Sequence, residues 1–215
     1  MASREALIDA AVQALRQDGP GALTTTHLAA QVGVVQSGFY RHFESIEALR
    51  AEAFERLTSE LAADVDRLRT EVFAEGGEAE ERRAYTEALV DQLDRSSRAR
   101  RLLDRYQFSE DELGGIVRAA RDRVTRDLGR YLESLLRAVE PELSQGIDAR
   151  SRARILQHAR ILVDEVLSVT RLLDETGVPG GRARVVELLD QRIGFGWEAF
   201  TDDLISYLQA QRRLR

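Results

Sequence analysis

The chain has 215 residues, of which 43% are hydrophobic and 32% charged, enough apolar material for one or two ordinary domains. It contains no cysteine, which excludes disulfides and thiolate metal ligands or nucleophiles. Its net charge of −6 does not indicate a nucleic-acid-binding protein, and no segment approaches the roughly 18–20 apolar residues of a membrane helix.

The first elements are three short helices. Residues 3–18 have apolar side chains at helical spacing with Ser3 as a plausible cap, so this start is an amphipathic helix and not a signal peptide, and we expect a cytoplasmic protein. Thr24 is expected to cap a second helix that ends at Gly33. A third helix is predicted over residues 37–43. Two short helices joined by a tight turn beginning with glycine are typical of a helix-turn-helix.

Longer helices follow. Ser45 is expected to cap an unbroken helix over residues 46–72, and a glycine-rich, acidic linker follows at residues 76–81. Further helices are predicted over residues 80–94 and 97–106. Ser109 and Glu112 have the spacing of a capping box for a helix that ends before Pro141, with Gly114 and Gly115 delaying its start. The last two helices are expected over residues 149–174 and 183–211.

These elements predict an all-α protein of about nine helices. We expect a helix-turn-helix DNA-binding domain over residues 1–47 and a larger helical domain for ligand binding and dimerisation over residues 48–215. The sequence offers no nucleophile–base pair, no phosphate-binding glycine loop and no metal-ligand cluster, so we expect neither an enzyme nor a cofactor or metal.

The segments TTTHLAAQVGV (residues 24–34) and FYRHF (residues 39–43) resemble the N-terminal signature of the TetR family of transcriptional regulators. The resemblance covers residues 3–50, and the FYRHF form is similar to a branch that includes repressors of unsaturated-fatty-acid synthesis. The family implies a homodimer whose last two helices pair with those of the partner. It also implies a small ligand in the core of the larger domain, which controls DNA binding by shifting the long fourth helix.

Several side chains of the helix-turn-helix suit DNA contacts. Glutamine pairs bidentately with adenine, serine adapts to several base edges, and glycine lets a thymine methyl group approach the backbone. Threonine, tyrosine and histidine can donate to phosphates, and the resemblance implies that Thr26 reaches a base. Phe39 and Phe43 are expected to anchor the third helix instead. The predicted DNA-binding residues are Thr24, Thr25, Thr26, Gln36, Ser37, Gly38, Tyr40, Arg41 and His42.

The electrostatics of this segment are weak. Residues 1–47 hold three arginines against five acidic residues. A lysine that the family often has after the capping serine is Ile46 here, and the serine that often precedes the third helix is Val35. We therefore expect only about 3–5 released counterions per subunit on DNA binding.

The second domain yields two further sets of candidates. Apolar side chains on the last helix predict a dimer seam, although the same stripe could pack only inside its own subunit; the seam residues are Leu189, Ile193, Trp197, Phe200 and Leu204. Polar groups among apolar neighbours are candidates for ligand binding, although His158 alone is more typical of a satisfied core residue; they are Arg105, Tyr106, Tyr131 and His158.

The sequence therefore predicts a ligand-responsive regulator of transcription. We expect a repressor that binds a pseudo-palindromic double-stranded DNA operator as a homodimer and responds to a small hydrophobic effector, for which a long-chain acyl group is one candidate. The alternative is a helical adaptor whose helix-turn-helix contacts only proteins.

Overall fold

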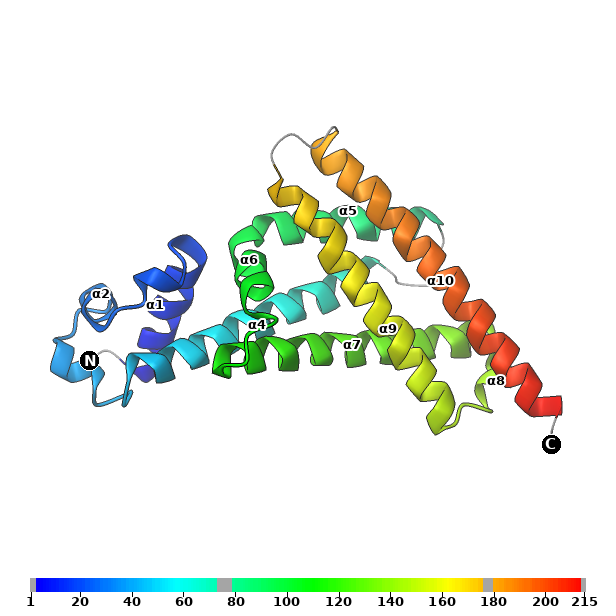
Figure 1. Cartoon of the computed structure of the whole chain (residues 1–215), viewed down its shortest axis with the longest axis horizontal. Coiled ribbons are helices and arrows are strands. Elements are labelled where there is room, and N and C mark those ends of the chain that lie inside the picture. The colour runs from blue at the N-terminus through cyan, green and yellow to red at the C-terminus, as the bar shows by residue number, and fades with distance from the viewer. Residues whose placement is uncertain (1–2, 73–78, 176–179, 214–215) are drawn as a thin grey trace. The chain divides into compact units, whose positions relative to one another are not determined.

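The computed structural model describes residues 3–72, 79–175 and 180–213, with Gln36, Val72, Ala79 and Val139 described by their backbone alone. The predicted linker glycines at 76 and 77 and the breaks at 177 and 179 lie outside these ranges. Every regular element of the described residues is helical (Figure 1). The elements are α1 (Arg4–Gln17), η1 (Pro20–Ala22), α2 (Thr25–Gln31), α3 (Gln36–Phe39), α4 (Ile46–Val72), α5 (Ala79–Arg95), α6 (Ser97–Tyr106), α7 (Glu112–Val139), α8 (Pro141–Ser144), α9 (Ala149–Thr170), η2 (Arg171–Asp174) and α10 (Gly181–Arg213).

The expected caps of the first helices are confirmed. The side chain of Ser3 accepts a hydrogen bond from the amide of Ala6, and Ser45 accepts one from Ala48 at 3.0 Å. These oxygens satisfy amides that have no partner within the first turn of a helix. The long fourth helix therefore begins after Ser45, as predicted.

The start of α7 differs from the prediction. Asp111 accepts a hydrogen bond from the amide of Gly114 at 2.9 Å, so Asp111 and not Ser109 caps this helix, and the predicted capping box is wrong. That bond lowers the pKa of Asp111 from its ordinary value. The two glycines lie inside the first turn, because the helix begins at Glu112. A Cβ on Gly114 would clash with the carbonyl oxygen of Ser109. Gly114 thus permits a close backbone approach instead of delaying the helix.

The chain forms two compact units, and each unit is made of two segments that are separate in the sequence. Unit 1 comprises residues 1–64 and 95–120, and unit 2 comprises residues 65–94 and 121–215. The helix-turn-helix segment therefore shares unit 1 with α6 and the beginning of α7.

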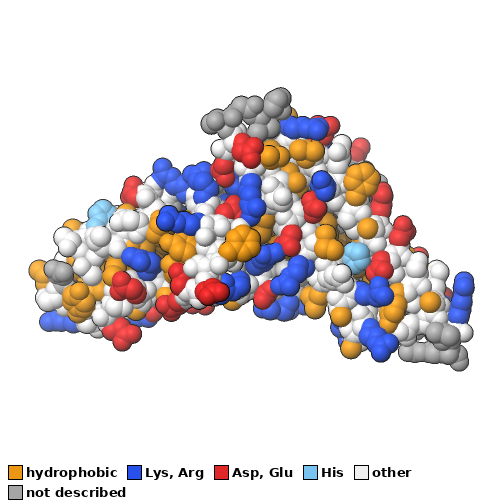
Figure 2. Space-filling view, in the orientation of Figure 1, with side chains coloured by type: hydrophobic (Ala, Val, Ile, Leu, Met, Phe, Trp, Pro, Cys, Tyr) orange, Lys and Arg blue, Asp and Glu red, His pale blue; other side chains and the backbone are white. Residues whose placement is uncertain are grey.

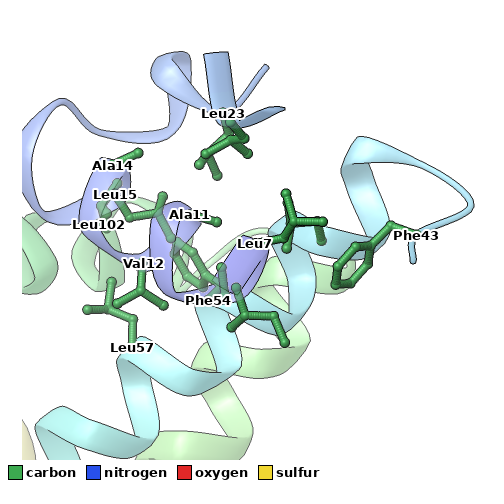
Figure 3. Packing of buried hydrophobic residues seen from close by; sticks show 14 of the residues in the cluster. Leu7, Ala11, Val12, Ala14, Leu15, Leu23, Phe43, Phe54, Leu57 and Leu102 are labelled. Atoms are coloured by element: carbon green, nitrogen blue, oxygen red, sulfur yellow. The ribbon is translucent and has the colours of Figure 1, made fainter. Parts of the chain in front are cut away.

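The core of unit 1 is built on α1. Leu7, Leu15 and Phe54 are fully buried, and Figure 3 shows side chains of α1 pointing toward α4 and α6. Because α1 alternates these apolar positions with charged ones at helical spacing, one face packs inward and the other carries the ion pairs described below. Phe39 and Phe43 join this core, so the prediction that they anchor the third helix is confirmed.

The core of unit 2 lies between α7, α9 and α10. Its buried residues include Leu132 and Leu136 of α7, Ile155 of α9, and Phe200 of α10. The helices α9 and α10 approach closely at Gly196, where a Cβ would lie 2.3 Å from the Leu162 side chain. No helix of the described residues has the length and apolar character needed to cross a membrane.

Candidate nucleic-acid interface

The turn between α2 and α3 is set by local hydrogen bonds. Thr24 caps α2 by accepting a bond from the amide of His27 at 3.2 Å. At the other end Gly33 has φ of +70°, and its amide bonds to the carbonyl of Ala30 while the next amide, that of Val34, bonds to Ala29 at 2.9 Å. This pair of bonds is a Schellman motif, which requires a residue that tolerates a left-handed backbone. The predicted roles of Thr24 and Gly33 are both confirmed.

The third helix is shorter than predicted. It is regular only over Gln36–Phe39, and residues 40–42 continue it as turns. Val35 occupies the cap position without a side-chain hydrogen bond, which agrees with the loss of the usual serine. The third helix is anchored in the core because Phe39 is fully buried and its ring packs against that of Phe43, with the ring centroids 5.8 Å apart.

The outer face of this motif carries polar side chains. Thr26, Ser37 and Arg41 are exposed, Tyr40 is 55% exposed, and His42 and Thr25 are half-buried. Gly38 is half-buried because it packs on the Val34 side chain, at 3.4 Å from a notional Cβ. The Gln36 side chain lies outside the described atoms. Apart from Gln36, the predicted DNA-contact residues therefore lie within one short stretch of surface over α2 and α3.

One exposed residue was not among the candidates. Val35 is 71% exposed directly before α3, an unusual place for a branched apolar side chain. The sequence analysis treated it only as a missing cap. An apolar side chain at the start of a recognition helix can pack on a thymine methyl group.

In unit 1, charged side chains of α1 form ion pairs with charged side chains of α4. Arg4 forms an ion pair with Glu52, and Arg16 forms one with Glu60. On α4, Arg56 pairs with Glu5 and with Asp9. The hydrogen bond to Glu5 is the main reason that the pKa of Arg56 is raised, and burial opposes it.

These pairs hold α1 on α4 and neutralise most of the charge on α1. No ion pair is recorded for Arg41 among the described residues. Arg41 is therefore the arginine of residues 1–47 that remains available to a phosphate.

The four predicted ligand residues are divided between the two units. In unit 1, Tyr106 is half-buried and packs edge-on against Phe54 at 5.3 Å, and Arg105 lies exposed beside it. In unit 2, His158 lies 3.3 Å from a carboxylate oxygen of Asp203 and is largely buried. His158 is thus a hydrogen-bonded residue of unit 2, as expected for a lone histidine among apolar neighbours.

Tyr131 lies in a polar cluster of unit 2 that the sequence did not indicate. The Arg69 guanidinium stacks on its ring at 4.8 Å, and the partly buried Tyr85 is a third member of the cluster. Burial raises the pKa of both tyrosines to about 12, against the opposing effect of Arg69. Helical spacing alone could not reveal this cluster because its members come from α4, α5 and α7.

Most of the predicted dimer residues lie inside their own unit. Leu189, Phe200 and Leu204 are fully buried, so their side chains do not form a free surface, while Ile193 and Trp197 are half-buried. The seam prediction is therefore corrected for the three buried residues. Phe200 and Leu204 pack inward because α10 has apolar residues on more than one face and its neighbours α7 and α9 cover this one.

The comparisons with known proteins agree with this arrangement. Residues 7–53 match the family described as bacterial regulatory proteins of the tetR family. No curated protein is significantly similar to the chain in sequence.

Three solved structures illustrate the shared fold. A TetR-family transcriptional regulator from Mesorhizobium loti is 17% identical, with a TM-score of 0.68 over 93% of this chain and 95% of that one. One from Streptomyces coelicolor is 16% identical, with a TM-score of 0.67 over 98% and 89%. The repressor FadR from Thermus thermophilus, solved with lauroyl-CoA, is 21% identical, with a TM-score of 0.54 over 89% and 92%. The described chain thus has the fold of TetR-family regulators.

Proposed function

We propose that this protein is a repressor that binds a pseudo-palindromic operator as a homodimer, because residues 7–53 match the tetR family of bacterial regulatory proteins and the described chain has the fold of such regulators. The observation that carries the proposal is the α2–α3 motif. It buries Phe39 beneath the third helix while Ser37, Tyr40 and Arg41 stay exposed above it. Such an arrangement supports reading in the major groove.

We assign the contacts by chemistry. Gln36 and Ser37 read base edges, and Val35 with Gly38 packs on a thymine methyl group. Tyr40, Arg41 and His42, together with the amides and hydroxyls at the start of α2, position the motif on the phosphates. Thr26 reaches a base from α2. Because the interface carries few charged residues, the presence of two such motifs in one dimer supplies much of the affinity for DNA.

A binding experiment tests this assignment against the adaptor alternative. The full-length chain is titrated into labelled DNA from upstream of its own gene, and fluorescence anisotropy is followed. A regulator binds a pseudo-palindrome whose half-sites lie about 34 Å, or a small multiple, apart. An adaptor gives the same weak signal with this DNA as with a scrambled duplex, and that outcome would reject the proposal.

For the dimer we propose the outer face of the α9–α10 pair. Ile161 on α9 is 49% exposed and Phe195 on α10 is 67% exposed. Ile161 precedes Leu162 in the chain, and Phe195 precedes Gly196. Because Gly196 contacts Leu162, the two exposed residues lie beside the point where α9 and α10 cross. Two exposed apolar side chains beside a close helix crossing support a surface for a second copy.

Sedimentation velocity tests the surface. Phe195→Glu places a charge in the proposed seam and is expected to give monomers. Phe108→Glu is the matched control, since Phe108 is 82% exposed in unit 1 and should leave the dimer intact. A dimer that survives the first substitution would place the interface elsewhere.

For the effector we propose a small hydrophobic molecule bound within unit 2 near Tyr131. Two structures with this fold were solved with acyl-CoA molecules, lauroyl-CoA and stearoyl-CoA, which supports a long-chain acyl group as the candidate. Ligand binding would act through α4, whose residues belong to both compact units. The regulator would work in the cytoplasm, where its DNA lies.

Native mass spectrometry of the purified chain would identify a retained ligand. If DNA affinity is unchanged by every molecule found to bind, the allosteric part of the proposal fails while the DNA-binding part stands.

A further inference from the structure

A basic cleft lies in unit 1, between the end of α1 and one face of α6. Its volume is about 480 Å³, which is within the range of small-molecule sites. The side chains of Leu15 and Leu102 are buried and form its apolar part. The polar lining consists of Gln17, Asp18, Gly19, Arg98, Arg101 and Arg105.

The arginines of this cleft stand out against the composition of the chain. Residues 95–105 contain five arginines and one aspartate, in a protein whose net charge is −6. Figure 2 shows the resulting gathering of basic side chains over α6 and the adjoining end of α1. Among the described residues no carboxylate is recorded in an ion pair with Arg98 or Arg105, although many other arginines of the chain have one.

The spacing of the arginines favours a ligand with more than one anionic group. Positions 98, 101 and 105 share one face of a helix, and the first and last are separated by about 10 Å along the axis at ~1.5 Å per residue. If both guanidiniums bound one phosphate group, two like charges would be drawn together. A ligand with two linked phosphates offers a separate phosphate group to each of two guanidinium forks, which match phosphate oxygens in geometry.

From these observations we propose that the cleft between α1 and α6 binds a small anion carrying a pyrophosphate group. The three arginines of the lining outweigh Asp18 by two charges, so a ligand with at least two negative charges is favoured over a single carboxylate. The site lies wholly in unit 1 and is separate from the effector proposed near Tyr131. It does not depend on operator binding.

Isothermal titration calorimetry of the full-length chain tests the site with three probes: orthophosphate, pyrophosphate and ADP. Pyrophosphate is expected to bind at least about tenfold more tightly than orthophosphate. ADP distinguishes the source of the group: binding equal to or tighter than that of pyrophosphate indicates a nucleotide ligand, and weaker binding indicates the free anion. Absence of binding by both pyrophosphate and ADP would overturn the proposal.

Charge variants locate the binding. The double substitution Arg98→Gln and Arg105→Gln is expected to weaken pyrophosphate binding at least about tenfold, because two charge-assisted contacts are lost. The double substitution Arg126→Gln and Arg150→Gln removes the same charge from exposed arginines of unit 2 and should leave binding unchanged. Equal losses in the two variants would reveal a nonspecific charge effect and overturn the proposal.

Two further measurements complete the test. Asp18→Asn removes the opposing carboxylate and is expected to tighten pyrophosphate binding about two- to threefold; weaker binding would contradict the site. The cleft arginines could instead contact DNA phosphates. If the Arg98→Gln, Arg105→Gln variant lost as much DNA affinity as an Arg41→Gln variant, the cleft would belong to the DNA interface and the proposal would fail. Thermal melting confirms that each variant is folded, as expected for exposed side chains.

Discussion

The salt dependence of DNA binding gives the sharpest test of the interface, and Arg41 is the residue to change. Arg4 and Arg16 are bound to carboxylates of α4, whereas no ion pair is recorded for Arg41 among the described residues. Each neutralised phosphate contributes a slope of about −0.9 to a plot of log K against log salt concentration. Loss of one contact in each subunit of a dimer therefore makes the slope shallower by about 1.8.

The same relation predicts the loss of affinity. At physiological ionic strength one contact is worth roughly a fivefold change in the binding constant, so Arg41→Gln should weaken a dimer about thirtyfold. The wild-type slope should lie between about −5 and −9, because we expect 3–5 counterions per subunit.

Fluorescence anisotropy across a series of salt concentrations measures both quantities. Arg16→Gln is the matched control, since its partner Glu60 already satisfies that guanidinium and the slope should not change. Identical slopes for the two variants, or a wild-type slope steeper than −9, would refute this account of the interface.

The remaining predictions concern stability. Gly114→Ala should lower the free energy of unfolding by more than about 1 kcal/mol because its Cβ meets the Ser109 carbonyl, whereas Gly115→Ala has open space and should be neutral or stabilising; urea denaturation that gave equal effects would contradict the close approach. Thr24→Ala should cost about 0.5–2 kcal/mol through loss of the α2 cap, and Thr24→Ser should restore most of it in the same assay. Burial alone would raise the pKa of Asp203, but hydrogen bonds from the imidazole and guanidinium on α9 outweigh it and lower the pKa. The stabilisation is therefore present above the unfolded pKa of about 3.9 and lost as pH falls below it, so Asp203→Asn should flatten the acid limb of a stability–pH profile; a parallel limb would show that the pairing contributes nothing.

Much of unit 1 could be predicted from consecutive residues. The caps at Ser3, Thr24 and Ser45 and the left-handed turn at Gly33 depend on a few neighbouring atoms, so local rules were sufficient. The same is true of the division of α3 into a buried Phe39 and exposed polar neighbours. The predicted cap of α7 was wrong because Ser109 and Asp111 are both residues that can cap a helix. The close approach of Ser109 to Gly114 decided between them.

The sequence by itself therefore determined the helix-turn-helix, the cap and the glycine turn of its second helix, and the outward face of its third helix, because these follow from periodicity and short-range hydrogen bonds. Only the tertiary structure decided which apolar face of α10 is buried and which charges are paired. It also brought the end of α1 to the arginines of α6, about eighty residues later in the chain. Those outcomes depend on contacts between segments far apart in sequence, and no local pattern specifies which segment covers a given face.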